Sequence, residues 1–224
     1  YGLVFAEALG YAWDLGIITA IGVHTDMATP PIDRYGSTEL KEEFLSPAIT
    51  GDYIAALAVS ETGGGSDVAA LKTFARKDGD DYIIDGEKMW ITNAKQADFF
   101  CTLVNTSNES PHKNKSLILI PASSAGLTIG DKIEKLGQHT SDTAPIFFDN
   151  VRVPQRYCIG KEGEGFKIQM QHFQEERIFL SASILIVLEK CISKTIEFCQ
   201  DRHAFGKAII ENQSIQFRLA ELQT

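Results

Sequence analysis

Three adjacent glycines lie within the run from Ser60 to Asp67, between two hydroxyl side chains. Adjacent glycines let a backbone approach a flat or phosphorylated ligand closely and expose its N–H groups, and Ser60 and Ser66 add hydroxyl donors. No Gly-Lys-Ser/Thr follows, so the run is not a P-loop, and the β-like segment after it excludes the glycine fingerprint that opens a crossover helix. The run alone predicts either a ligand-binding loop or a tight turn that holds no ligand.

An aromatic and a hydroxyl side chain follow at Trp90 and Thr92. Residues two apart in a β-strand point to the same face. The pair could therefore cover one side of an aromatic cofactor and hydrogen-bond its edge. A tryptophan buried in the protein core is the alternative interpretation.

Charged groups mark two further segments. Glu175 and Glu176 precede Arg177 on an otherwise apolar helical stretch. A carboxylate there can act as a general base if desolvation raises its pKa, and solvent-exposed charges are the alternative. The segment from Arg202 to Lys207 lies between two predicted helices, where its cations could serve as helix-end charges or bind a pyrophosphate.

The elements that position these residues fall into three zones. Residues 1–54 read as short helices, one of which begins with a cap at Ser37 and runs to Phe44. Residues 55–160 contain short β-rich runs separated by turn signals, which predict an antiparallel β-barrel or sandwich. Asp85-Gly86, between two such runs, predicts a hairpin turn. The runs are residues 53–59, 82–84, 98–104, 116–120 and 145–148.

A long helix is predicted to begin after Gly163-Glu164-Gly165 and to run to about Asp201, and a second helix begins near Gln213. A helix of that length belongs in a bundle or an oligomer interface. Its stretch from Ile178 to Leu188 is apolar and predicts a buried helix segment. Six residues recur at helical spacing and therefore share one broad face of the long helix. They are Phe166, Met170, Phe173, Arg177, Leu180 and Ile184.

Composition narrows the class of protein. The 224 residues are 44% hydrophobic and 23% charged, as in ordinary globular proteins. A net charge of -9 argues against a nucleic-acid or anionic-membrane binder, although a local basic patch could still hold a phosphate. The longest apolar stretch is too short for a transmembrane segment.

Four scattered cysteines favour reduced thiols, and no metal site is expected. The start at Tyr1 and the unfinished helical pattern at the other end suggest a piece of a longer protein.

Four segments, in this order, resemble motifs of the acyl-CoA dehydrogenase family. Ala58 to Asp67 matches A-V-[ST]-E-x-x-x-G-S-D, and Gly86 to Asn93 matches G-x-K-x-[WY]-I-[TS]-N. Gly163 to Phe166 matches the motif that precedes the long helix, and Arg202 to Lys207 matches R-x-x-F-G-K. Two departures are Thr62, where proline is more frequent, and Leu57, where many members have an aromatic residue; both leave the glycines in place.

The resemblance implies a three-domain FAD-dependent protein. Residues 1–54 would end an N-terminal helical domain, 55–160 would form a middle β-domain, and 161–224 would begin a truncated C-terminal helical bundle. It also implies an acyl-CoA substrate, an electron-transfer flavoprotein as acceptor, and a homotetramer built as a dimer of dimers. The mitochondrial matrix would be its location, with the bacterial cytoplasm as the alternative.

Site residues follow from the same resemblance by position. Trp90 would cover one flavin face, Thr92 would lie near the flavin N5, and Arg202 and Phe205 would reach the FAD of a neighbouring subunit. The implied FAD contacts are Leu57, Ala58, Val59, Ser60, Gly65, Ser66, Trp90, Ile91, Thr92, Arg202, Phe205 and Gln213. The implied substrate contacts are Ser66, Gln174, Glu175 and Arg177.

The implied reaction converts an acyl-CoA into a trans-2-enoyl-CoA, and it needs a base for the α-proton. Most family members carry this base in a segment that this chain does not include. A minority, among them the long-chain and isovaleryl enzymes, carry it directly before the arginine of the long helix, where Glu176 precedes Arg177. The resemblance therefore implies Glu176 as the base, and long or branched substrates. The alternatives are an acyl-CoA oxidase that uses oxygen, and a non-catalytic FAD or acyl-CoA binding relative.

Overall fold

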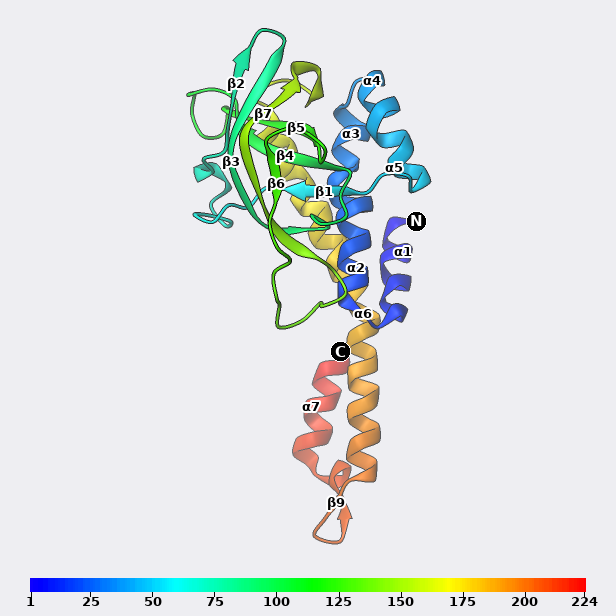
Figure 1. Cartoon of the computed structure of the whole chain (residues 1–224). Helices are drawn as coiled ribbons and strands as arrows, with labels where there is room; N and C mark the ends of the chain where they lie inside the picture. The colour runs from blue at the N-terminus through cyan, green and yellow to red at the C-terminus, as the bar shows by residue number, and fades with distance from the viewer. The chain divides into compact units, whose positions relative to one another are not determined.

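The computed structural model describes residues 1–224. The chain forms two compact units. The larger unit is Asp14–Ile178, and the smaller unit combines Tyr1–Trp13 with Phe179–Thr224. Figure 1 labels the elements of both units.

Short helices open the larger unit, and Figure 1 shows them gathered on one side of a sheet. The side chain of Asp14 caps the first helix by accepting from the N–H groups of Gly16 and Ile17. The cap predicted at Ser37 is confirmed, because its hydroxyl accepts from Leu40 N. The helical segments are α2 (Leu15–Gly22), the π-helical turn Val23–Ala28, α3 (Pro30–Tyr35), α4 (Thr38–Leu40), the π-helical turn Lys41–Leu45 and α5 (Ser46–Thr50).

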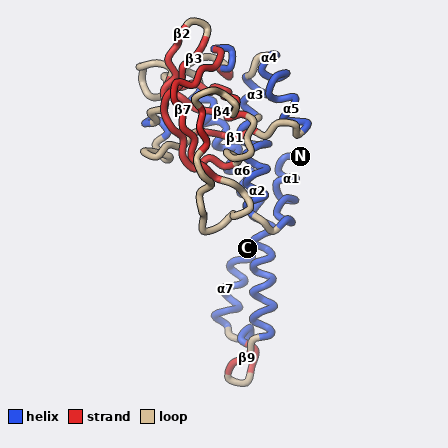
Figure 2. Tube along the Cα trace, viewed as in Figure 1, coloured by secondary structure: helices blue, strands red, loops and turns tan.

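Eight strands form one sheet in the order β6-β7-β3-β2-β4-β5-β8, with β1 paired to β4 (Figure 2). The strands are β1 (Ala55–Ala58), β2 (Phe74–Asp78), β3 (Asp81–Thr92), β4 (Phe99–Asn105), β5 (Lys115–Pro121), β6 (Leu127–Ile129), β7 (Thr143–Pro154) and β8 (Cys158–Ile159). Most pairs are antiparallel, as expected, but β1 runs parallel to β4, with Ala55 opposite Phe99. Both faces of β4 are buried, so the sheet supplies most of the core.

The hairpin turn predicted at Asp85-Gly86 is wrong, because both residues lie inside the continuous strand β3. The reversal occurs at Gly79, where Asp78 pairs with Asp81. Gly86 instead lies at a register shift between β3 and β7 and has φ +140°. A Cβ atom at Gly86 would lie 2.8 Å from Thr73 Cα. Glycine therefore serves a bulge and a close backbone approach here, and not a chain reversal.

The predicted long helix is confirmed as α6 (Gly165–Asp201). Phe166, Met170 and Phe173 of the predicted face are partly buried and pack against the core. The most deeply buried side chains of this segment are Ile168, Gln169, His172 and Glu176. Three of these four are polar, and an apolar pattern does not reveal them.

The smaller unit consists of helices and one short hairpin. It contains α1 (Gly2–Leu9), the 3₁₀ turn Gly10–Ala12, the rest of α6, β9 (His203–Ala204), β10 (Lys207–Ala208), the 3₁₀ turn Ile209–Glu211 and α7 (Gln213–Gln223), which confirms the predicted second helix. Gly10 packs closely on α6, since a Cβ there would lie 2.8 Å from Ile186 Cβ. The expectation that Ile178 to Leu188 is buried is confirmed for one face only: Phe179 and Ile186 are buried, whereas Leu185 and Leu188 are each 52% exposed.

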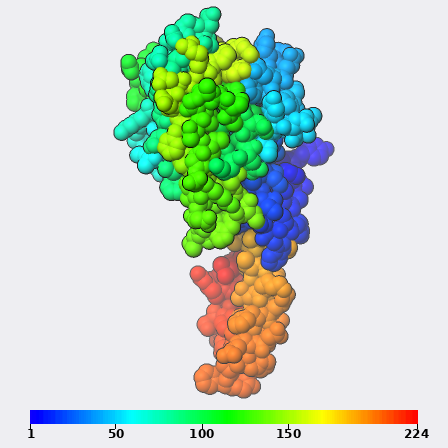
Figure 3. Space-filling model, in the orientation of Figure 1, coloured from blue at the N-terminus to red at the C-terminus, as the bar shows by residue number.

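In the space-filling view, the chain between β4 and β7 (green) spreads over the front of the larger unit (Figure 3). All four cysteines are free. None of the helices has the length and apolar character needed to cross a membrane.

Replacing Gly86 with alanine should destabilise the protein. The added Cβ would collide with Thr73 at a backbone conformation that L-residues rarely adopt, so we expect a loss of about 3 kcal/mol of unfolding free energy. Gly79→Ala is the matched control, because Gly79 also has positive φ (+62°) but a Cβ added there would meet no atom within 4 Å. Denaturant unfolding of both variants checks this, and equal losses would contradict it.

Candidate functional site

The glycine loop follows β1 directly and is exposed at most of its positions. Glu61 and Gly64 form a tight turn through reciprocal backbone bonds of 2.8 and 3.1 Å. The turn does not depend on glycine, because none of Gly63 to Gly65 has positive φ. A Cβ at Gly63 would meet no atom within 4 Å, and at Gly65 the nearest atom would be 3.5 Å away. The loop thus presents bare, accessible backbone, which suits close approach by a ligand.

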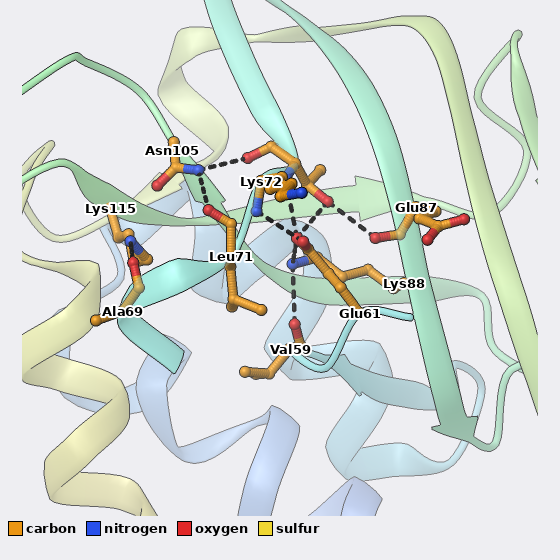
Figure 4. A network of polar contacts seen from close by, with 10 residues as sticks. Val59, Glu61, Ala69, Leu71, Lys72, Glu87, Lys88, Asn105 and Lys115 are labelled. Atoms are coloured by element: carbon orange, nitrogen blue, oxygen red, sulfur yellow. Dashed lines mark hydrogen bonds and ion pairs between the residues drawn. The ribbon is translucent and has the colours of Figure 1, made fainter. Parts of the chain in front are cut away.

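A buried ion pair lies beneath this loop (Figure 4). Lys88 Nζ lies 2.9 Å from Glu61 Oε1, and the two side chains are 0% and 7% exposed. Lys88 also donates to Val59 O at 2.9 Å. The Glu61 carboxylate accepts from the backbone N–H groups of Lys72 at 2.6 Å and Thr73 at 2.9 Å, and from the Thr73 hydroxyl at 2.6 Å.

Two opposing effects act on the pKa values of this pair. Burial lowers the pKa of Lys88 to about 8, against the attraction of Glu61. Burial alone would raise the pKa of Glu61, but the charge of Lys88 and the donors from Thr73 and Lys72 bring it below its usual value. Both groups are therefore charged at neutral pH.

The segment around Trp90 leaves the regular strand. Trp90 has φ +65°, and the register of β3 against β7 shifts between Lys88 and Ile91. Burial still alternates here, because Ile91 is buried between Trp90 and Thr92, which are more exposed; that these two side chains share a face stays a prediction. The core alternative for Trp90 is excluded, because its side chain is 61% exposed. Met89 N donates to Ser60 O at 2.8 Å, which joins this segment to the glycine loop.

The end of β3 is fixed by Asn93. This residue is 1% exposed and has φ +67°. Its amide nitrogen donates to Ala20 O on α2 at 2.8 Å, and its backbone N–H donates to Asp142 O at 3.3 Å. Trp90 to Thr92 are consequently held at both ends.

Two neighbouring carboxylates on α6 have different environments. Glu175 is about half exposed and forms a 2.6 Å ion pair with Arg34, and this bond lowers its pKa. Glu176 is 9% exposed, and burial raises its pKa to about 7 although Arg177 and the Gln169 amide oppose the shift. Gln169 Nε2 lies 3.3 Å from Glu176 Oε1. Glu176 therefore has the basicity of a general base that works at neutral pH.

The neighbours of Glu176 are polar and incompletely bonded. Gln169 Oε1 and both ring nitrogens of His172 are buried without a hydrogen-bond partner. Burial, followed by the charge of Arg34, lowers the pKa of His172. The carboxylate near this ring is that of Glu175, whose Oε2 lies 3.9 Å from His172 Nδ1, and burial is the main cause of the raised pKa of Glu176.

Comparisons with known proteins bear on the whole chain. Three family models match it: the N-terminal domain of acyl-CoA dehydrogenase at residues 1–52, the middle domain at 56–151 and the C-terminal domain at 163–224. The chain belongs to the acyl-CoA dehydrogenase family.

Individual relatives agree with this assignment. The mitochondrial short-chain specific acyl-CoA dehydrogenase of Rattus norvegicus is 34% identical over 99% of this chain and 53% of its own length. An acyl-CoA dehydrogenase of Bacillus subtilis is 34% identical over 100% of this chain and 59% of its own. The chain thus spans a little over half the length of these relatives.

Solved structures share the fold. Acyl-CoA dehydrogenase from Geobacillus kaustophilus is 38% identical with a TM-score of 0.91, covering 100% of this chain and 59% of its own. The FAD complex of PigA is 32% identical with a TM-score of 0.94, covering 99% and 58%. The predicted fold class is confirmed: along the sequence, one helical part precedes the β-sheet domain and another follows it.

In this acyl-CoA dehydrogenase chain the predicted site residues fall into two groups. The larger unit holds Leu57 to Ser66, Trp90 to Thr92 and Gln174 to Arg177. The smaller unit holds Arg202, Phe205 and Gln213 around the β9–β10 hairpin, where Phe205 is fully exposed and has φ +52°.

Sequence reasoning did not select five buried polar residues near the site. Glu61, Lys88 and Asn93 lie inside the two matched motifs. The motifs therefore pointed to these three residues, although none of them was predicted as a ligand contact. Gln169 and His172 gave no signal, because polar residues on a helix are usually exposed. Only the structure shows that they lie on the buried face with Glu176.

The raised pKa of Glu176 predicts a pH-dependent effect of Glu176→Gln on stability. The folded protein binds this proton more tightly than the unfolded chain, so stability is lost as pH rises from about 4.5 to about 7. The neutral variant avoids that loss. We expect it to gain on the order of 1–3 kcal/mol relative to wild type at pH 8, and much less at pH 4.5.

Denaturant unfolding at the two pH values measures this difference. Glu175→Gln is the matched control, because the pKa of Glu175 is lowered and its removal should not favour the variant at pH 8. A Glu176→Gln effect that does not change with pH would rule out a perturbed carboxyl.

Proposed function

We propose that this chain is part of an enzyme that catalyses FAD-dependent α,β-dehydrogenation of an acyl-CoA thioester. The observation that carries the proposal is Glu176, a buried carboxyl with a pKa near 7, directly before Arg177 in an acyl-CoA dehydrogenase chain. A base of this strength is substantially ionised at neutral pH and still accepts a proton readily.

The fit of FAD rests on two exposed features of the larger unit. The glycine loop offers backbone without side chains, and the exposed ring of Trp90 offers a flat surface. We propose that FAD contacts Leu57 to Ser66 and Trp90 to Thr92, with Arg202, Phe205 and Gln213 reaching the FAD of a partner subunit. FAD, when bound, would supply the acceptor for the β-hydrogen.

Glu176 would remove the α-proton of the acyl-CoA. Gln169 donates toward one of its carboxylate oxygens and so restrains its orientation. Ser66, Gln174, Glu175 and Arg177 are the proposed substrate contacts, and Glu175 is held by Arg34 at 2.6 Å. The position of the base on α6 favours long or branched acyl groups.

Glu176→Gln in the full-length enzyme should abolish bleaching of the flavin absorbance by acyl-CoA while FAD remains bound, because the amide cannot accept the α-proton. Anaerobic spectra with short, long and branched acyl-CoAs provide the measurement. Glu189→Gln, an exposed change on the same helix, should bleach like wild type. Full bleaching by Glu176→Gln would place the base in another segment of the protein.

We further propose an electron-transfer flavoprotein as acceptor, in a homotetramer of the mitochondrial matrix or the bacterial cytoplasm. The fully exposed Phe205 at the β9–β10 hairpin supports a subunit contact. The three-domain division at residues 54 and 160 is proposed with it, supported by the separate family-model matches.

The acceptor proposal predicts how the reduced enzyme responds to oxygen. After reduction by acyl-CoA, the flavin should reoxidise slowly in air-saturated buffer and at least tenfold faster with an electron-transfer flavoprotein. Stopped-flow absorbance gives both rates. Fast reoxidation by oxygen with hydrogen peroxide as product would identify an oxidase instead.

A further inference from the structure

We propose that Lys88, acting through Glu61, is the positioning residue that holds the glycine loop and the Trp90 segment together as one FAD-binding surface. This inference rests on the proposed function, because it concerns the FAD contacts proposed above. Lys88 itself is fully buried and would touch neither FAD nor substrate.

The contacts of Lys88 join the two segments within or directly beside their proposed FAD contacts. Its ammonium group donates to Val59 O (Figure 4), which is in the first set of proposed contacts. Lys88 itself lies two residues before Trp90, where the second set begins. The backbone bond from Met89 N to Ser60 O, 2.8 Å long, lies between these points. A shift of the Lys88 side chain would therefore move both segments.

Glu61 provides the counterpart within the loop. Its carboxylate is held by three donors from Lys72 and Thr73 in addition to Lys88. The Thr73 hydroxyl also lies 2.9 Å from Glu87 O, next to Lys88 in β3. The loop is thus attached to the segment just before β2 and to β3 by bonds with fixed directions.

Stability alone does not account for this pair. Two charges taken out of water lose much of their hydration, and an apolar pair of similar size is often as stable or more stable. Directional bonds, by contrast, can hold a backbone conformation that is otherwise unfavourable. Trp90 has such a conformation at φ +65°, in a segment without regular strand pairing.

The test is a double-mutant cycle of Lys88→Met and Glu61→Gln in the full-length protein, in a Trp13→Phe background that leaves Trp90 as the tryptophan in this chain. Each single change should weaken FAD binding at least tenfold. The double variant should bind FAD no more weakly than the worse single variant, because one shared interaction is lost. Flavin fluorescence titration gives the dissociation constants.

A positioning role also predicts a spectroscopic change that lost stability does not explain. The emission of Trp90 in the folded apoprotein should shift in the Lys88→Met variant, and kcat should fall more than KM rises at saturating FAD. Arg152→Met is the control, since Arg152 forms an exposed pair with Asp78, and it should leave both measurements unchanged.

FAD affinity within twofold of wild type in a folded Lys88→Met variant would overturn the proposal, whatever its thermal stability. If wild type binds no FAD, the proposed function fails, whereas an unchanged Trp90 emission would refute the positioning role by itself.

A titration of the wild-type protein keeps the proposal testable if the variants do not fold. The charged groups that face this pair are Lys88, Glu61 and Lys115, and Lys115 in turn faces Asp67. Loss of the Lys88 proton should shift the Trp90 emission and weaken FAD binding near pH 8. Constant emission and affinity from pH 7 to 9.5 would contradict the proposal.

Discussion

The buried contact between Lys88 and Glu61 is the interaction on which the arrangement of the site depends. A charge removed from water is tolerated only when it is paired and hydrogen-bonded. Glu61 meets this condition with Lys88, two backbone N–H groups and a hydroxyl. Because these partners come from the segment just before β2 and from β3, satisfying one carboxylate also fixes the course of the loop that follows β1.

Glu176 shows the opposite use of burial. It too is a buried carboxylate, but its hydrogen-bonding neighbour is an amide at 3.3 Å, and burial outweighs the opposing charge of Arg177. The pKa of Glu61 is consequently lowered and that of Glu176 is raised. Different surroundings thus give two glutamates of one chain different roles, a charged structural anchor and a candidate base.

Sequence patterns predicted the features that depend on local periodicity. The helices α6 and α7 and the main strands appeared where apolar spacing placed them. The failures involve long-range contacts. Asp85-Gly86 has the composition of a turn, but the approach of Thr73 makes Gly86 part of a bulge. The polar face of α6 is buried by the rest of the unit, which no local pattern records.

The candidate site residues also divide into those that local patterns predicted and those that depend on long-range contacts. Motif spacing located the glycine loop and the Trp90 segment, whereas the bond between them depends on Lys88, whose charge alone would predict exposure.

Glycine itself serves two purposes in this site. Gly86 is required by the protein's own packing, because a Cβ would strike Thr73. Gly63 to Gly65 are required by neither packing nor φ, and a loop without side chains at these positions agrees with the proposed close approach of a ligand.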